Sequence, residues 1–154
     1  MTQTTKKIDP MHLPETVTKA LRGVEALVHQ GGLEPKLVSL CKLLCSYRNG
    51  CAYCVDMHTK NARAGGETEQ RLYATLVWRE VPFFSARERA ALAFAEALTR
   101  LGEEGVPEAV FAAARAQFTE PEIVSLTVVI IAINMWNRLK AVIHSEPGSY
   151  HPPG

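Results

Sequence analysis

The sequence lacks the features that would point to nucleic acid, to a membrane or to secretion. Lysine and arginine number 17 against 16 aspartate and glutamate residues, so no charge excess favours nucleic acid or an anionic membrane as a partner. The longest nearly apolar stretch, residues 123–136, is shorter than the roughly 20 residues that a bilayer requires. Residues 1–7 lead into no apolar run, so no secretory signal is expected. These absences predict a soluble, cytoplasmic protein.

Cysteine is scarce and confined to one short segment, which contains Cys41, Cys45, Cys51 and Cys54. A secreted fold that depends on disulfides spreads its cysteines so that they join distant loops. In a reducing compartment, clustered cysteines more often carry redox chemistry or bind a metal. The segment is therefore the main clue to function.

Helical spacing of apolar residues recurs along the chain, and no segment alternates apolar and polar residues over the length of a strand. Proline and two capping boxes, which begin at Ser85 and Thr119, mark helix starts, and glycine or Asn-Gly marks helix ends. The helices expected from these signals cover about residues 14–30, 35–48, 51–64, 67–81, 85–101, 107–118 and 119–144. The pattern predicts one all-α domain of six or seven helices over residues 1–145, and a flexible tail over residues 146–154.

The last expected helix is apolar on nearly every side over residues 123–133. A helix of this kind must be buried all round. The centre of a monomer could bury it, and so could a second subunit. We expect a homo-oligomer.

Two thiols and an imidazole fall on one face of the helix expected over residues 51–64. Cys51 lies near the helix start, where the positive end of the helix dipole lowers a thiol pKa. Cys54 follows one turn later and can form a disulfide with it. His58, four residues further on, shares the face of Cys54 and can accept its proton. One thiolate could reduce a peroxide and become a sulfenic acid, with which the other thiol would condense.

Other interpretations of these residues remain open. Zinc is the chemical rival, although a structural site usually draws two close ligand pairs from a knuckle and a separate helix. Here all candidate ligands lie on two adjacent helices. Alternatively, the pair could simply be small buried residues. Cys41 and Cys45 lie among leucines, which favours core packing, with a backup thiol at Cys45 as the alternative. Trp78 and Trp136 are expected in the core or an interface.

Several motifs together resemble the AhpD-like alkylhydroperoxidases of the carboxymuconolactone decarboxylase superfamily. The resemblance extends over roughly residues 33–139. Its motifs are NGCAYCVDMHTK at residues 49–60, GETEQRL at 66–72, WREVPFF at 78–84, ERAAL at 88–92 and NMWNR at 134–138. It implies an all-helical AhpD-like bundle that assembles into trimers or hexamers.

The resemblance also implies catalytic roles. Cys54 would be the thiol that attacks the peroxide, Cys51 would resolve it and His58 would relay the proton, whereas the helix dipole alone favours Cys51 as the more acidic thiol. The family usually carries a glutamate twelve residues before the first cysteine, where this chain has Ser39. A serine at this possible relay position can pass on a hydrogen bond but cannot supply the negative charge that orients a histidine.

The sequence therefore predicts a thiol-dependent peroxide reductase with peroxiredoxin-type activity. It would act on an organic hydroperoxide or a disulfide, use an unidentified thiol or dithiol donor, and need no cofactor or metal. A general disulfide oxidoreductase or redox sensor with little peroxidase activity is the alternative, because of Ser39. A binding protein with vestigial thiols is a third possibility. The intact cysteine pair argues against the lactone chemistry of the decarboxylase branch.

Overall fold

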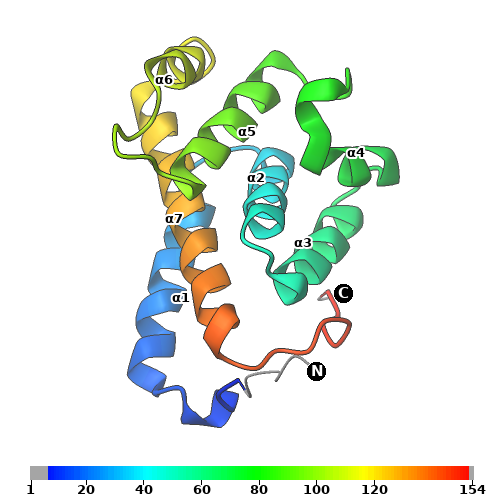
Figure 1. Ribbon diagram of the computed structural model, residues 1–154, viewed down its shortest axis with the longest axis vertical. Helices are drawn as coiled ribbons and strands as arrows, with labels where there is room; N and C mark the ends of the chain where they lie inside the picture. The colour runs from blue at the N-terminus through cyan, green and yellow to red at the C-terminus, as the bar shows by residue number, and fades with distance from the viewer. Residues whose placement is uncertain (1–6, 153–154) are drawn as a thin grey trace.

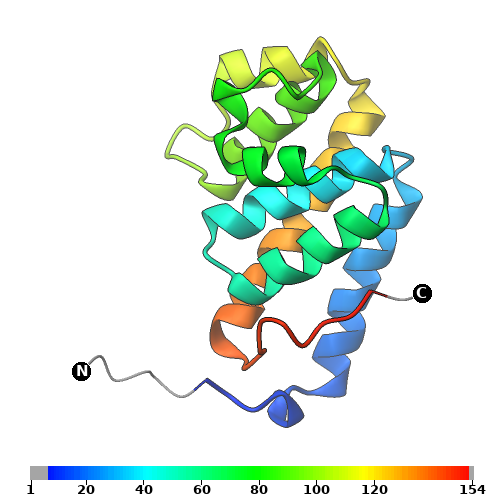
Figure 2. The same ribbon diagram turned by 90° about the vertical axis from the view of Figure 1, so that its right-hand side faces the viewer.

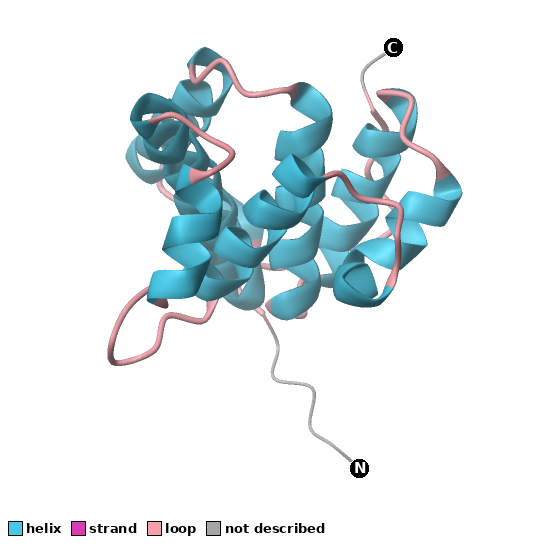
Figure 3. Cartoon of the chain, turned by 90° about the horizontal axis from the view of Figure 1, so that it is seen from above, coloured by secondary structure: helices cyan, strands magenta, loops and turns pink. Residues whose placement is uncertain are grey.

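The computed structural model describes residues 7–152, and within them it contains helices and no strand (Figures 1 and 3). The all-α prediction is confirmed, and most boundaries differ from those expected by one to three residues. The α-helices are α1 Glu15–Gln30, α2 Pro35–Arg48, α3 Ala52–Ala64, α4 Glu69–Ala74, α5 Ala86–Thr99, α6 Glu108–Arg115 and α7 Glu120–Val142, and the short 3-10 helices are η1 Pro10–His12 and η2 Thr75–Glu80.

The two predicted capping boxes begin α5 and α7. The backbone N–H of Ser85 donates to the Glu88 carboxylate at 2.8 Å, and the N–H of Thr119 donates to Glu122 at 2.7 Å. Each glutamate thereby satisfies a backbone donor that the helix itself leaves unpaired. These local signals explain why the starts of both helices could be predicted.

The prediction of one helix over residues 67–81 is wrong in one respect. The α-helix ends with α4, and η2 follows it with a non-helical residue, Val77, at φ −114° and ψ 28°. The Arg89 guanidinium donates to the carbonyl oxygens of Trp78 at 3.0 Å and of Val81 at 3.1 Å. These carbonyls are held by a side chain of α5, so the tighter course of η2 depends on a tertiary contact.

Helix α2 lies in the middle of the bundle and packs against α3, α5 and α7, while α1 runs alongside α7 (Figures 1 and 2). Its apolar residues are almost entirely buried, because neighbours cover it on several sides. Since α2 packs against the helix that carries the cysteine pair, it supports that helix from the centre of the bundle.

Helix α7 is only partly buried by its own chain. Leu126, Val129 and Ile133 are buried, whereas Val124 and Ile131 are exposed. The expectation that the helix is buried all round is therefore not met within one chain. By length and composition α7 could cross a bilayer, but core helices of soluble proteins share these properties, and α7 packs against α1, α2 and α5.

The chain after α7 turns back and runs along α3 (Figure 2). The Asp56 carboxylate accepts a hydrogen bond from the N–H of Gly148 at 3.0 Å. Lys60 donates to the carbonyl of Tyr150 at 2.9 Å, and the Tyr150 hydroxyl donates to Asn61 at 2.8 Å. The expected flexible tail therefore makes specific contacts as far as Tyr150, while residues 153–154 lie outside the described residues.

Candidate active site

The cysteine pair lies at the start of α3 and is joined as a disulfide. Cys51 is the N-cap of the helix and Cys54 lies in its first turn, with 5.3 Å between their Cα atoms. This separation is normal for a disulfide. Gly50 precedes the pair with φ +64°, a left-handed conformation that glycine adopts without strain. The Asn-Gly turn thus allows α3 to begin at Cys51, as the sequence predicted.

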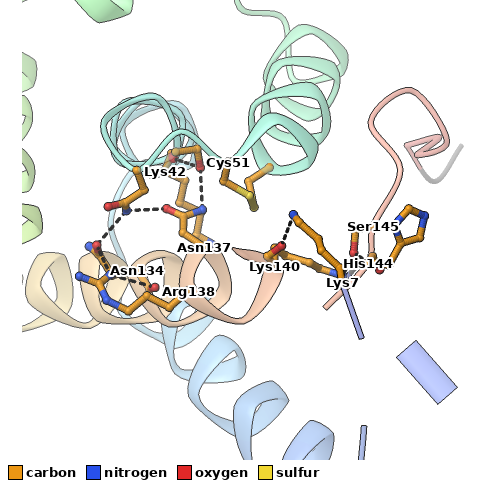
Figure 4. The surroundings of a disulfide bond; sticks show 12 residues. Lys7, Lys42, Cys51, Asn134, Asn137, Arg138, Lys140, His144 and Ser145 are labelled. Atoms are coloured by element: carbon orange, nitrogen blue, oxygen red, sulfur yellow. Dashed lines mark hydrogen bonds between the residues drawn. A yellow bond between two sulfur atoms is a disulfide. The ribbon is translucent and has the colours of Figure 1, made fainter. Parts of the chain in front are cut away.

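A hydrogen-bonded network of amides holds this turn against α7 (Figure 4). The Asn49 amide donates to Asn137 at 2.8 Å and to Asn134 at 3.0 Å. Asn137 in turn donates to the Ser46 hydroxyl at 3.2 Å, and the N–H of Cys51 donates to the Ser46 carbonyl at 3.0 Å. The asparagines of the motif at residues 134–138 therefore position the cysteine pair from a distant part of the chain.

Replacing the buried Asn137 with leucine is expected to lower the free energy of unfolding by about 1–3 kcal/mol, because the buried Ser46 hydroxyl and the amide of Asn49 would each lose a partner. Urea denaturation of the oxidised protein measures this loss. The control is Arg138→Ala, which removes an exposed donor to the same network and is expected to cost no more than about 0.5 kcal/mol. Equal losses in the two variants would contradict a positioning role for the buried amide.

His58 is buried on α3, with 8% of its surface exposed. Its Nε2 atom has no hydrogen-bond partner among the described residues. Burial, with a smaller contribution from the positive charge of Lys42, lowers the pKa of the imidazole to about 3. The ring is therefore neutral at physiological pH. An unpaired buried nitrogen is uncommon and calls for an explanation such as a water or a catalytic role.

The two cysteines of the disulfide, Cys51 and Cys54, line different cavities. Cys54, His58 and Ser39 line a cavity of about 700 Å³ whose walls come mainly from α1, α2, α3 and α7. Cys51 does not line this cavity and instead faces a pocket of about 160 Å³ beside the Asn-Gly turn and the residues after α7. The apolar part of the wall of the larger cavity is formed by Val28, Leu33, Val38, Met57, Ile133 and Trp136.

An ion pair in the same cavity was missed by sequence reasoning. Lys42 of α2 pairs with the carboxylate of Glu25 of α1, and the indole N–H of Trp136 donates to the second Glu25 oxygen at 3.2 Å. Trp136, expected only as a core or interface aromatic, thus also binds this carboxylate. One signal was available, since Glu25 interrupts the apolar stripe of the first helix between Leu21 and Val28. The pairing itself joins two helices, so no local pattern reveals it.

Cys41 and Cys45 lie in the core and do not line the cavity. The Thr99 hydroxyl donates to the Cys45 sulfur at 3.1 Å. Burial raises the pKa of the Cys45 thiol to about 11 and that of Cys41 well above its usual value. This environment agrees with core packing and not with a reactive backup thiol. Among the described residues, no group of three or more histidine, cysteine, aspartate or glutamate side chains could hold a metal ion.

Two of the other recognised motifs meet around one arginine. Arg71 donates to Glu67 at 2.9 Å and also pairs with Glu88, which belongs to the capping box of α5. Glu67 is buried, so its charge requires such a partner. These motifs join α4 to α5 and lie outside the cavity, which gives them a structural role.

The model of the carboxymuconolactone decarboxylase family matches residues 14–97. This chain belongs to that family and has the AhpD-like all-α fold. The family name and the debrominase described below show that the fold carries enzymes of different chemistry, so the reaction must be argued from the site.

Three proteins are similar to this chain in sequence or in structure. YdfG of Bacillus subtilis (strain 168), which is uncharacterised, is 36% identical over 131 residues, covering 85% of this chain and 89% of YdfG. The crystal structure of ATU0492 from Agrobacterium tumefaciens matches with a TM-score of 0.85 and 39% identity over 97% of this chain and 100% of that one. ATU0492 is of unknown function and is provisionally assigned to antioxidant defence as AhpD. The debrominase Bmp8 shares the fold, with a TM-score of 0.77 and 20% identity over 87% of this chain and 72% of its own.

Proposed function

We propose that this protein is a thiol-dependent reductase of organic hydroperoxides, in which Cys54 attacks, Cys51 resolves and His58 moves the proton. One observation carries the proposal: Cys54 and the unpartnered, buried nitrogen of His58 belong to one cavity, while Cys51 is bonded to Cys54 from another pocket. A peroxide in the cavity would lie beside the two residues that supply a sulfur and a base. The cavity therefore favours Cys54 over Cys51, although the helix dipole favours the reverse.

The chemical steps balance with these residues alone and one external dithiol. Neutral His58 takes the Cys54 thiol proton, and the thiolate attacks one peroxide oxygen, so that a sulfur–oxygen bond forms while the oxygen–oxygen bond breaks. The alkoxide takes the proton from His58 and leaves as an alcohol. Cys54 is now a sulfenic acid, oxidised by two electrons. The Cys51 sulfur then displaces its oxygen as water, which forms the disulfide.

The disulfide must be reduced by a donor before the next turnover. A donor thiolate that attacks the Cys51 sulfur through its smaller pocket would release Cys54 as the thiolate, ready for the next peroxide. The donor becomes a disulfide and supplies both electrons. No cofactor takes part in this sequence of steps.

The size and lining of the cavity favour an organic peroxide over hydrogen peroxide. A space of about 700 Å³ with a largely apolar wall falls in the size range of sites that bind small organic molecules. We expect cumene hydroperoxide to be consumed with a higher kcat/KM than hydrogen peroxide when dithiothreitol is the donor. Equal or reversed preference would contradict an apolar binding site.

The same assay separates the proposal from the disulfide-oxidoreductase alternative, which Ser39 favours. Consumption of cumene hydroperoxide well above the uncatalysed rate supports the reductase. Rapid exchange with small disulfides without peroxide turnover supports the alternative instead. Thiols that remain unreactive at neutral pH after reduction of the pair contradict both.

We also propose that the protein is a cytoplasmic trimer or hexamer. Exposed apolar side chains on α7, among them Val124, Ile131 and Val142, support a contact with further copies of the chain. Light scattering from the purified protein distinguishes these assemblies from a monomer.

A further inference from the structure

The relay position leaves a gap in the site that another carboxylate could fill. Ser39 lines the cavity, as does Glu25, which enters it from α1. Both oxygens of Glu25 are engaged, one by Lys42 and the other by the indole of Trp136 at 3.2 Å. The negative charge that position 39 lacks is therefore present in the same cavity, fixed by two partners on two other helices.

Lys42 links the Glu25 carboxylate to the electrostatics of His58 and Cys54. It follows Ser39 by three residues on α2, so the two side chains share a helix face, and it is only 8% exposed. Lys42 and His58 line the same cavity, and the positive charge of Lys42 is the second of the two causes, after burial, that lower the pKa of His58. A buried lysine with a carboxylate partner is a strong local charge because little water screens it.

The other charged groups around the cavity are more exposed or lack a carboxylate partner there. The charged and titratable residues that line it are Arg22, Glu25, His29, Lys42, Tyr53, Cys54, His58 and Lys140. Arg22 and His29 are exposed, and Lys140 lies over the ring of Tyr53, 4.8 Å from its centroid. Among these groups, the Glu25–Lys42 pair alone combines burial of the cation with a fixed counter-charge.

We propose that the Glu25–Lys42 ion pair sets the charge around Cys54 in a site that has no carboxylate at Ser39, with Lys42 stabilising the Cys54 thiolate and Glu25 fixing the position of Lys42 and offsetting its charge. Both are positioning residues that act through Cys54 and His58. When Cys54 gives its proton to His58, the thiolate, the imidazolium, Lys42 and Glu25 sum to zero charge. The proton transfer therefore separates charge without leaving a net charge in a buried site.

The proposal rests on the thiol chemistry proposed for Cys54 and is tested by titrating that thiol. In a reduced Cys51→Ser background, the ultraviolet absorbance of the thiolate reports Cys54, since Cys41 and Cys45 are buried with raised pKa values. Lys42→Met is expected to raise the pKa of Cys54 by about one unit or more, because an attractive cation is lost and Glu25 is left unpaired. Glu25→Gln is expected to lower it by a similar amount, because Lys42 loses its counter-charge.

Opposite shifts are the signature, since a merely structural pair would move the thiol in the same direction when either partner is lost. Lys42→Arg, which keeps the charge, is expected to titrate close to the parent. The matched controls are Lys60→Met and Asp56→Asn, which break a pair of the same kind, 3.0 Å apart on α3, that does not line the cavity. Neither control is expected to move the pKa of Cys54.

A further variant keeps the test decisive if Lys42→Met does not fold. Adding Ser39→Glu to Glu25→Gln restores a carboxylate to the cavity and is expected to return the pKa of Cys54 toward that of the parent. Shifts of one sign, no shift in Glu25→Gln, or no reversal by Ser39→Glu would overturn the proposal. The titration needs no peroxide, so a protein that fails to reduce peroxide still gives a readable result.

Discussion

Replacing Cys54 with serine is expected to reduce the consumption of cumene hydroperoxide to the uncatalysed rate. A serine hydroxyl is not ionised at neutral pH and cannot be oxidised to a sulfenic acid, so neither the attack nor the electron transfer remains. Cys51→Ser is expected to behave differently: without a thiol donor it reduces about one equivalent of peroxide and stops, because the sulfenic acid has no partner in the protein. The measurement is peroxide consumed per protein, with dithiothreitol limiting and then in excess.

The contrast between the two serine variants depends on the separate spaces that the sulfurs face. The control is Cys45→Ala, which removes a buried thiol outside the cavity and is expected to leave turnover unchanged. Normal turnover in Cys54→Ser, with a sulfenic acid on Cys51, would reverse the assignment of the two roles and would support the helix-dipole argument instead.

Replacing His58 with asparagine is expected to slow peroxide reduction at neutral pH by about 10²–10⁴-fold, the usual contribution of a positioned base. Burial and Lys42 lower the pKa of His58 to about 3, so the ring is neutral and able to accept a proton from about pH 5 upward. The parent therefore keeps a thiol and a neutral base together above this pH, and its kcat/KM is expected to stay nearly level there.

The pH dependence of kcat/KM in His58→Asn tests whether neutral His58 is the base. Without the base, the reaction depends on thiolate formed by loss of the proton to water, so kcat/KM should rise about tenfold per pH unit up to the pKa of an ordinary thiol, about 8.5. Activity is then partly recovered under alkaline conditions. The control is His29→Asn, an exposed histidine of the same cavity, for which little change is expected. An unchanged rate and profile in His58→Asn would exclude the imidazole from the proton transfer.

The parts of the fold that could be predicted are those specified by short-range signals. Capping boxes at Ser85 and Thr119 and the Asn-Gly turn before Cys51 each contain, within a few residues, the groups that satisfy a helix end. The break after α4 could not be predicted in this way, because it depends on Arg89 of α5. The course of the tail depends on Asp56 and other residues of α3 that lie far away in the sequence.

The residues of the candidate site also differ in whether short-range signals could predict them. Cys51, Cys54 and His58 lie within eight positions on one helix, so helical geometry was enough to bring them together. Glu25 and Lys42 are 17 residues apart on different helices, and only the packing of both α1 and α2 against α7 brings them to the cavity. The sequence showed that a carboxylate was absent at Ser39 and could not show that another helix provides one.

The identity of the sulfur that first becomes oxidised tests the proposed mechanism most directly. Reduced wild-type protein is mixed with one equivalent of cumene hydroperoxide in the presence of dimedone, and the modified cysteine is located by mass spectrometry. The mechanism predicts a dimedone adduct on Cys54 alone and, without dimedone, one molecule of cumyl alcohol for each Cys51–Cys54 disulfide. An adduct on Cys51, or intact peroxide beside reduced thiols, would contradict it.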